Sequence, residues 1–175
     1  MGHGNSVYQN LVHIPLLIKY PNINTRNINE EVVNSVDLMP TVLDVLAFEV
    51  PGNIQGQSLL KLEFEPGKSR NIISESFPNG YLISWHQRFN RVERAIFSDP
   101  YKLISSTAGK RELYNLSKDP NEMENLYKVD DDTSKGIEAR LETWLKTTVA
   151  EGESSASVKL DKGALDRLRT LGYVQ

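Results

Sequence analysis

The sequence contains no cysteine, which excludes disulfide bonds and thiolate metal sites. Basic residues are not in excess, because 20 Lys and Arg stand against 23 Asp and Glu, for a net charge of -3. A general nucleic-acid-binding protein needs a basic surface, so the composition argues against that class. No run approaches the roughly 18 apolar residues of a membrane span. The longest apolar run, residues 14–18, lacks the basic leader and the cleavage site of a signal peptide.

What is present is a globular composition, with 25% charged and 39% hydrophobic residues in a chain of 175. This length suits one domain, or one small domain and a piece of another. The clearest pattern lies at 91–127, where turn sequences separate three alternating apolar runs, 91–98, 101–106 and 112–115. The pattern predicts an antiparallel meander. Residues 81–86 are predicted to supply its first strand.

An amphipathic helix is predicted at 134–149, because its apolar residues recur along one face, and it is expected to pack on the meander. Asp130, Asp131 and Asp132 precede it. Three adjacent acids without the glycine and terminal Glu of an EF-hand do not form a calcium loop. They are expected to favour the N-terminus of the helix instead.

The first half of the chain reads differently. Residues 11–20 are almost uniformly apolar, which is typical of a strand buried on both faces of a mostly parallel sheet. His13 within it is expected to be a packed core histidine. Because the preceding residues are too few to supply neighbouring strands, the chain is interpreted as beginning in the middle of a fold.

Two further elements are predicted before the meander. Residues 37–47 form a short amphipathic helix, with Asp37 as its N-cap rather than a metal ligand. Residues 71–77 form another strand. Glu75 near its end is expected to pair with a neighbouring Arg.

Several phrases resemble the C-terminal region of sulfatases, members of the alkaline-phosphatase-like superfamily, and they follow the family's order. They are GHGNSVYQNLVHIPLLIKYP, VNSVDLMPTVLDVLAFEVPGNIQGQSLL, AIFSDPYKLI, ELYNLSKDPNEMENL and ALDRLRTLGYV. One departure is Ala47, which replaces the glycine usual at the end of the helix, where a left-handed residue is often needed.

The resemblance implies an α/β fold that is divided into three parts. Residues 1–78 would be the C-terminal part of the main domain, an incomplete end of a mostly parallel α/β sheet. Residues 79–150 would form a small α+β subdomain, an antiparallel sheet of about four strands with a packed helix. Residues 151–175 would be a linker and a terminal helix.

The resemblance also implies hydrolysis of a sulfate ester by the intact protein, with His3 contacting the ester. The family's nucleophile is a Cys or Ser in a C/S-x-P/A-x-R motif, converted to formylglycine, beside calcium or a similar divalent ion. The nearest phrase here, Ser98-Asp99-Pro100-Tyr101-Lys102, has Lys in place of Arg and lies in a turn. This chain alone therefore has no certain catalytic residue and no metal ligand, and it is predicted to be inactive.

The expected partners are the sulfate ester and the missing N-terminal catalytic half. The family is often exported, but this chain carries no signal, so the compartment is left open. Two alternatives stand beside the sulfatase interpretation. One is a noncatalytic remnant or interaction module; the other is part of a related phosphoester or phosphonate hydrolase.

Overall fold

The computed structural model describes residues 5–20, 26–60, 70–153, 163 and 167. The chain divides into two compact units, Met1–Arg140 and Leu141–Gln175. The elements are α1 (Gln9–Val12), η1 (Ser35–Asp37), α2 (Leu38–Val45), β1 (Ile72–Ser76), α3 (Gly80–Trp85), η2 (Gln87–Phe89), β2 (Glu93–Ser98), β3 (Tyr101–Ser106), β4 (Arg111–Asn115) and α4 (Asp132–Glu153). Helix α4 begins in the first unit and continues into the second. None of the described helices is long and apolar enough to cross a membrane.

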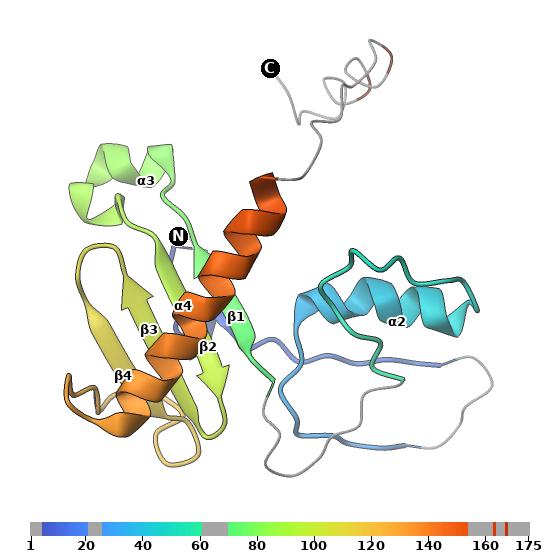
Figure 1. Ribbon diagram of the computed structural model, residues 1–175, viewed down its shortest axis with the longest axis horizontal. Helices are drawn as coiled ribbons and strands as arrows, with labels where there is room; N and C mark the ends of the chain where they lie inside the picture. The colour runs from blue at the N-terminus through green and yellow to red at the C-terminus, as the bar shows by residue number, and fades with distance from the viewer. Residues whose placement is uncertain (1–4, 21–25, 61–69, 154–162, 164–166, 168–175) are drawn as a thin grey trace. The chain divides into compact units, whose positions relative to one another are not determined.

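The first unit is built on an antiparallel four-stranded sheet in the order β1-β2-β3-β4 (Figure 1). The predicted meander is confirmed by β2, β3 and β4. Its predicted first strand at 81–86 is wrong, because this segment forms α3, where the Asn79 side chain accepts from the Tyr81 N–H and caps the helix. The predicted strand at 71–77 is formed as β1, but it pairs antiparallel with β2 and is the edge of this sheet.

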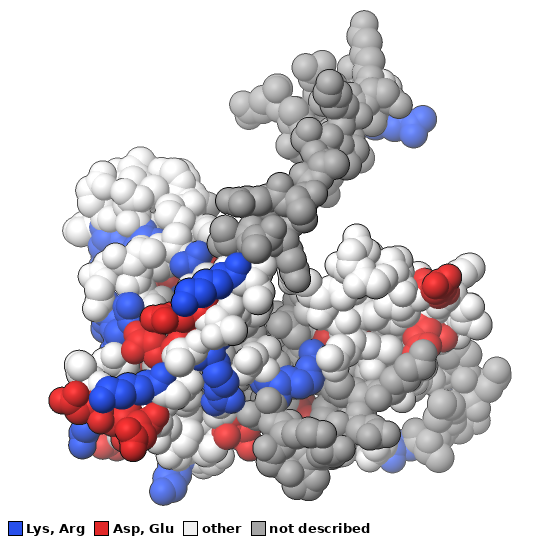
Figure 2. Space-filling model, in the orientation of Figure 1, with Lys and Arg blue, Asp and Glu red and all other residues white. Residues whose placement is uncertain are grey.

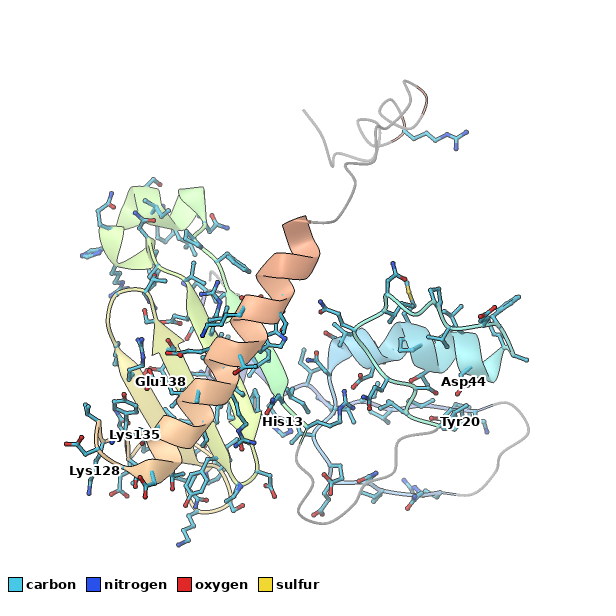
Figure 3. All side chains as sticks on the ribbon, viewed as in Figure 1. His13, Tyr20, Asp44, Lys128, Lys135 and Glu138 are labelled. Carbon is cyan, nitrogen blue, oxygen red and sulfur yellow. The ribbon has the colours of Figure 1, made fainter. Side chains whose placement is uncertain are left out.

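The predicted strand at 11–20 is not formed. After the short helix α1, residues 13–20 have no regular structure, and Ile14 and Leu17 are 77% and 88% exposed. A strand needs neighbours to pair its backbone groups, and no described strand runs beside this segment. His13 is consequently not a core residue: it is exposed and ends α1 (Figure 3).

The predicted helix at 37–47 is confirmed as α2, which ends two residues earlier than predicted. Asp37 occupies the N-cap position, but its side chain makes no capping bond to α2. The carboxylate is fully buried instead, where it accepts hydrogen bonds from the N–H groups of Asn34 and Gln57 and pairs with Arg70 at 2.8 Å. Burial raises the pKa of Asp37, but these donors outweigh it and the pKa lies below its ordinary value.

The two faces of the sheet bury different residues, because side chains alternate along each strand. One face presents Ala95, Ile104 and Tyr114, which form a buried cluster. The part of α4 up to Arg140 lies on the other face. There the Arg111 Nε is 2.8 Å from Glu138 (labelled in Figure 3), an ion pair between β4 and α4.

Candidate functional site

The segment Val7–Gln9, far from the sheet in sequence, is held against it. Val7 is completely buried in the cluster of Ala95, Ile104 and Tyr114. Burying one valine side chain contributes about 2 kcal/mol. The sheet thereby fixes the chain three residues after the GHG phrase.

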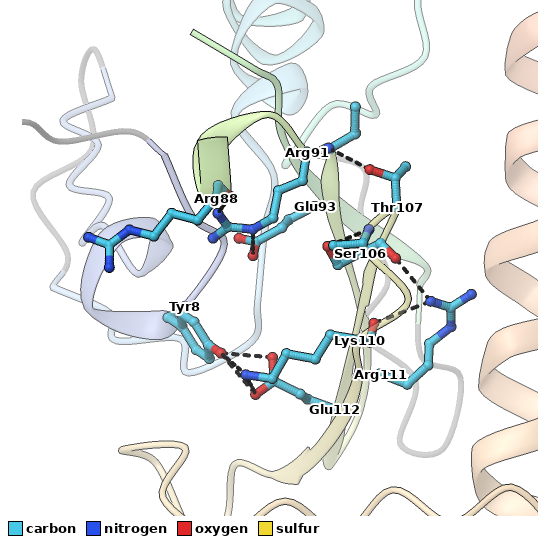
Figure 4. A network of polar contacts seen from close by, with 11 residues as sticks. Tyr8, Arg88, Arg91, Glu93, Ser106, Thr107, Lys110, Arg111 and Glu112 are labelled. Atoms are coloured by element: carbon cyan, nitrogen blue, oxygen red, sulfur yellow. Dashed lines mark hydrogen bonds and ion pairs between the residues drawn. The ribbon is translucent and has the colours of Figure 1, made fainter. Parts of the chain in front are cut away.

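A carboxylate on β4 reinforces this attachment. The Tyr8 hydroxyl donates to Glu112 Oε2 at 2.7 Å (Figure 4). The Tyr114 hydroxyl donates to Glu112 Oε1 at 2.7 Å. The Lys110 Nζ lies 2.8 Å from Oε1. These four residues, Tyr8, Lys110, Glu112 and Tyr114, are called the Glu112 cluster below. The cluster joins two phenols, one cation and one carboxylate, so the charge of Glu112 is compensated although its side chain is buried.

The titration of the Glu112 cluster follows from its geometry. Burial raises the pKa of Glu112, but the hydrogen bonds from Lys110, Tyr8 and Tyr114 outweigh it, so the pKa lies below the ordinary value. Burial first, and then the bonded carboxylate, raise the pKa of both Tyr8 and Tyr114. The phenols therefore stay protonated as donors at neutral pH. This arrangement suits positioning rather than proton transfer.

A second buried contact holds the next residue of the segment. The Lys102 Nζ on β3 lies 2.6 Å from Glu122, and the two side chains are 0% and 3% exposed. The other oxygen of Glu122 accepts the backbone N–H of Gln9 at 2.6 Å. Burial lowers the pKa of Lys102 more than its pairing with Glu122 raises it, so the pKa lies below the ordinary value.

The phrase ELYNLSKDPNEMENL folds back along β4. The Leu113 N–H donates to Asn125 Oδ1 at 3.0 Å, and the Leu126 N–H donates to the Leu113 carbonyl at 2.8 Å. Asp119 Oδ2 accepts the Glu124 N–H at 2.9 Å and closes the turn between them. This phrase and AIFSDPYKLI meet in the Lys102–Glu122 pair, so the resemblance rests on residues that build the fold.

The family model described as "N-sulphoglucosamine sulphohydrolase, C-terminal" matches residues 4–151. The chain belongs to the sulfatase family, as a C-terminal portion. Arylsulfatase K of Homo sapiens is 31% identical over 125 residues, 69% of this chain and 23% of the relative. The uncharacterized sulfatase YidJ of Escherichia coli (strain K12) is 32% identical over 130 residues, 73% of this chain and 24% of the relative.

A solved structure supports the fold of this sulfatase portion. It is that of BT4656 in complex with its substrate, D-glucosamine-2-N,6-O-disulfate, and it matches with a TM-score of 0.51 and 24% identity, over 63% of this chain and 23% of that chain. The sulfatase portion thus spans about a quarter of the length of the curated relatives that it matches, 23% and 24% of those named above.

His3, to which the resemblance assigned substrate binding, lies outside the described residues. The structure describes the segment that follows His3, with Tyr8 and Gln9 bound to the sheet. Sequence reasoning did not single out the residues that bind this segment. The sequence pattern could have indicated these residues. Lys102 and Glu112 lie on the same face of the sheet as the buried Ile104, and charged side chains on a buried face need partners.

The surroundings of Ser98 in the sulfatase portion are not those of a catalytic nucleophile. Ser98 is buried at the end of β2, and Arg140 donates a hydrogen bond to its hydroxyl oxygen. Arginine cannot act as a base, and a serine nucleophile needs one. Ser98, Asp99, Tyr101, Asp132, Thr133, Gly136, Ile137 and Arg140 line an open depression of about 410 Å³.

Two other predictions about charged residues are confirmed. Glu75 pairs with Arg94 at 2.7 Å, which is a structural role. Asp131 Oδ2 accepts the Ser134 N–H at 2.8 Å and caps the first turn of α4.

Proposed function

We propose that the intact protein hydrolyses a sulfate ester and that His3 contacts the ester. The observation that carries this proposal is the match to the sulfatase family over residues 4–151, which includes the loop after His3. The attachment of Val7, Tyr8 and Gln9 to the sheet supports it, because a binding residue needs a loop whose base is fixed.

We further propose that the remaining catalytic half packs on the first part of this chain. Large apolar side chains are exposed there in unusual number: Ile14, Leu16, Leu17, Ile18, Met39, Val42, Leu46 and Phe48. Exposed apolar groups that follow one another in this way mark surfaces that another part of a protein covers. The curated relatives have the required additional length.

The divalent ion and the formylglycine belong to that other half in this proposal. Among the described residues, no group of three His, Asp or Glu side chains could hold a metal ion. The described residues therefore do not fit the metal, and we derive no step through it. Their role is to place His3 and to shape the approach to the site.

Hydrolysis of p-nitrophenyl sulfate tests the proposal. The purified 175-residue chain, assayed with calcium, should give no rate above buffer. A longer protein that carries the C/S-x-P/A-x-R motif should hydrolyse the ester, and His3→Ala should lower its kcat by about 100-fold or more. A His3-dependent rate from the short chain would refute the division of roles. A longer protein that prefers a phosphonate ester would refute the sulfatase assignment.

A further inference from the structure

The corner formed by α3 and η2, residues 78–92, carries basic and aromatic side chains and no acidic one. It contains no Asp or Glu, although the whole chain has 23, and it carries His86, Arg88 and Arg91. In the view of Figure 2 the α3 region is white, with basic side chains beneath it. Leu82 alone is buried there and holds α3 to the unit.

Two aromatic rings stand exposed on this corner. Tyr81 and Trp85, one helical turn apart, are 65% and 66% exposed. Their ring centroids are 5.0 Å apart and their planes are inclined by 56°. The pair is built into a capped helix, because Asn79 bonds to the Tyr81 N–H. Aromatic faces carry partial negative charge and attract the C–H faces of sugar rings.

A cation without an ion-pair partner among the described residues follows the aromatic pair. The Arg88 guanidinium lies 4.7 Å from the centroid of the Phe89 ring, and among the described residues it makes no ion pair. Arg91 beside it is committed, since it pairs with Glu93 at 2.6 Å and donates to the Arg88 carbonyl. Figure 4 shows Arg88 extending away from that pair. A guanidinium is suited to binding a sulfate group, because several of its N–H groups can donate hydrogen bonds to the sulfate oxygens.

We infer that Tyr81, Trp85 and Arg88 form a binding platform for a sulfated saccharide, with the sugar ring against the aromatic pair and a sulfate at Arg88. The surface argues for a saccharide over a protein partner. Its large exposed side chains are aromatic, amide and basic, whereas the large aliphatic side chains that are exposed among the described residues all lie outside it, for example at 14–18 and on α2. This inference rests on the proposed function for its choice of sulfate.

Titration of the isotopically labelled 175-residue chain with a heparin tetrasaccharide, followed by NMR, tests the platform. Amide and indole signals of 79–92 should shift saturably. A chemically desulfated tetrasaccharide should bind about tenfold more weakly, because the ion pair with Arg88 is lost. Trp85→Ala and Arg88→Gln should each weaken binding by about tenfold.

Phe48→Ala and Arg26→Gln, two exposed residues away from the corner, are the matched controls and should leave binding unchanged. Absent shifts, equal binding of the desulfated sugar, equal loss in the controls or shifts centred on 14–18 would each overturn the platform. Arg88→Gln is a surface change, so it remains informative if Trp85→Ala fails to fold. Hydrolysis of p-nitrophenyl sulfate by a longer protein is judged separately, so failure of the platform and failure of the proposed function are distinguishable.

Discussion

At the scale of single residues, two positions carry unusual local conditions. Ala47, just after α2, has a φ of 57°, in the left-handed region that glycine adopts without strain. The family's usual glycine is therefore missing while the geometry that needs it is kept. Lys102 and Glu122 are the other case, two charges with almost no exposure whose stability depends on each other.

Ala47→Gly should stabilise the protein. An L side chain in the left-handed region costs roughly 1–2 kcal/mol, and Ala47 is exposed, so no packing is lost. We expect the free energy of unfolding to rise by about 1 kcal/mol, measured by urea denaturation. Ala139→Gly, at an exposed position inside α4, is the control and should lower it by about 1 kcal/mol. A lower stability of Ala47→Gly would contradict the strain argument.

Lys102→Met should destabilise strongly, by about 3–5 kcal/mol, because it leaves the Glu122 carboxylate buried without its cation. The double variant Lys102→Met with Glu122→Gln should recover part of this loss, since no uncompensated charge remains. Chemical denaturation of both variants measures the difference. Lys118→Met, an exposed control, should change stability by less than about 0.5 kcal/mol. If the double variant is no more stable than Lys102→Met, the uncompensated charge of Glu122 is not the cause of the destabilisation.

At the scale of elements, the decisive contacts join the N-terminal segment to β3 and β4. Val7 supplies apolar burial, and Tyr8 and Gln9 supply hydrogen bonds to Glu112 and Glu122. These contacts hold the segment to the sheet in place of the backbone hydrogen bonds that a paired strand would make. The segment is thus bound to the sheet mainly by side chains.

Tyr8→Phe tests this attachment, because it keeps the ring and removes only the hydroxyl that donates to Glu112. The free energy of unfolding at pH 7 should fall by about 1.5–3 kcal/mol, the range for hydrogen bonds to charged groups. Tyr101→Phe, for which the structure shows no hydroxyl partner among the described residues, is the control and should change little.

The effect of Tyr8→Phe should also depend on pH. The folded pKa of Glu112 lies below the ordinary 4.5, so its bonds stabilise the fold above pH 4.5, and this stability is lost as the pH falls through the folded pKa. The difference between wild type and Tyr8→Phe should shrink between pH 7 and pH 3.5 in urea denaturation. If the stability difference between wild type and Tyr8→Phe is the same at both pH values, the lost interaction does not involve the ionised Glu112.

At the scale of the whole molecule, protection from proteases should not rise steadily from the N-terminus to the C-terminus. Residues 13–20 and 26–33 are largely exposed, whereas Val7 and the strands β1 to β4 are in the buried core. Exposed irregular chain opens at little cost and is cut first by proteases.

Limited proteolysis should therefore cut first within 13–20 or 26–33 and leave the sheet intact. The short N-terminal piece should remain bound after cleavage, because Val7, Tyr8 and Gln9 hold it to β3 and β4. Native size-exclusion chromatography followed by mass spectrometry measures this. Tyr8→Phe should release the piece more readily. Loss of the piece from wild type immediately after cleavage would refute its attachment, and first cuts within β1 to β4 would refute the stability of the sheet.

The sequence by itself determined the elements whose cause is local. Turn residues at Asp99-Pro100 and around Gly109, with alternating apolar residues between them, specified β2, β3 and β4. Ordered phrases also identified the sulfatase family before any contact was known. Tertiary structure alone decided which strand lies at the sheet edge, because 71–77 and 81–86 both suited a strand and only pairing with β2 distinguishes them. It also decided the partners of Glu112, since Tyr8 is 104 residues away and no local pattern joins groups at that separation.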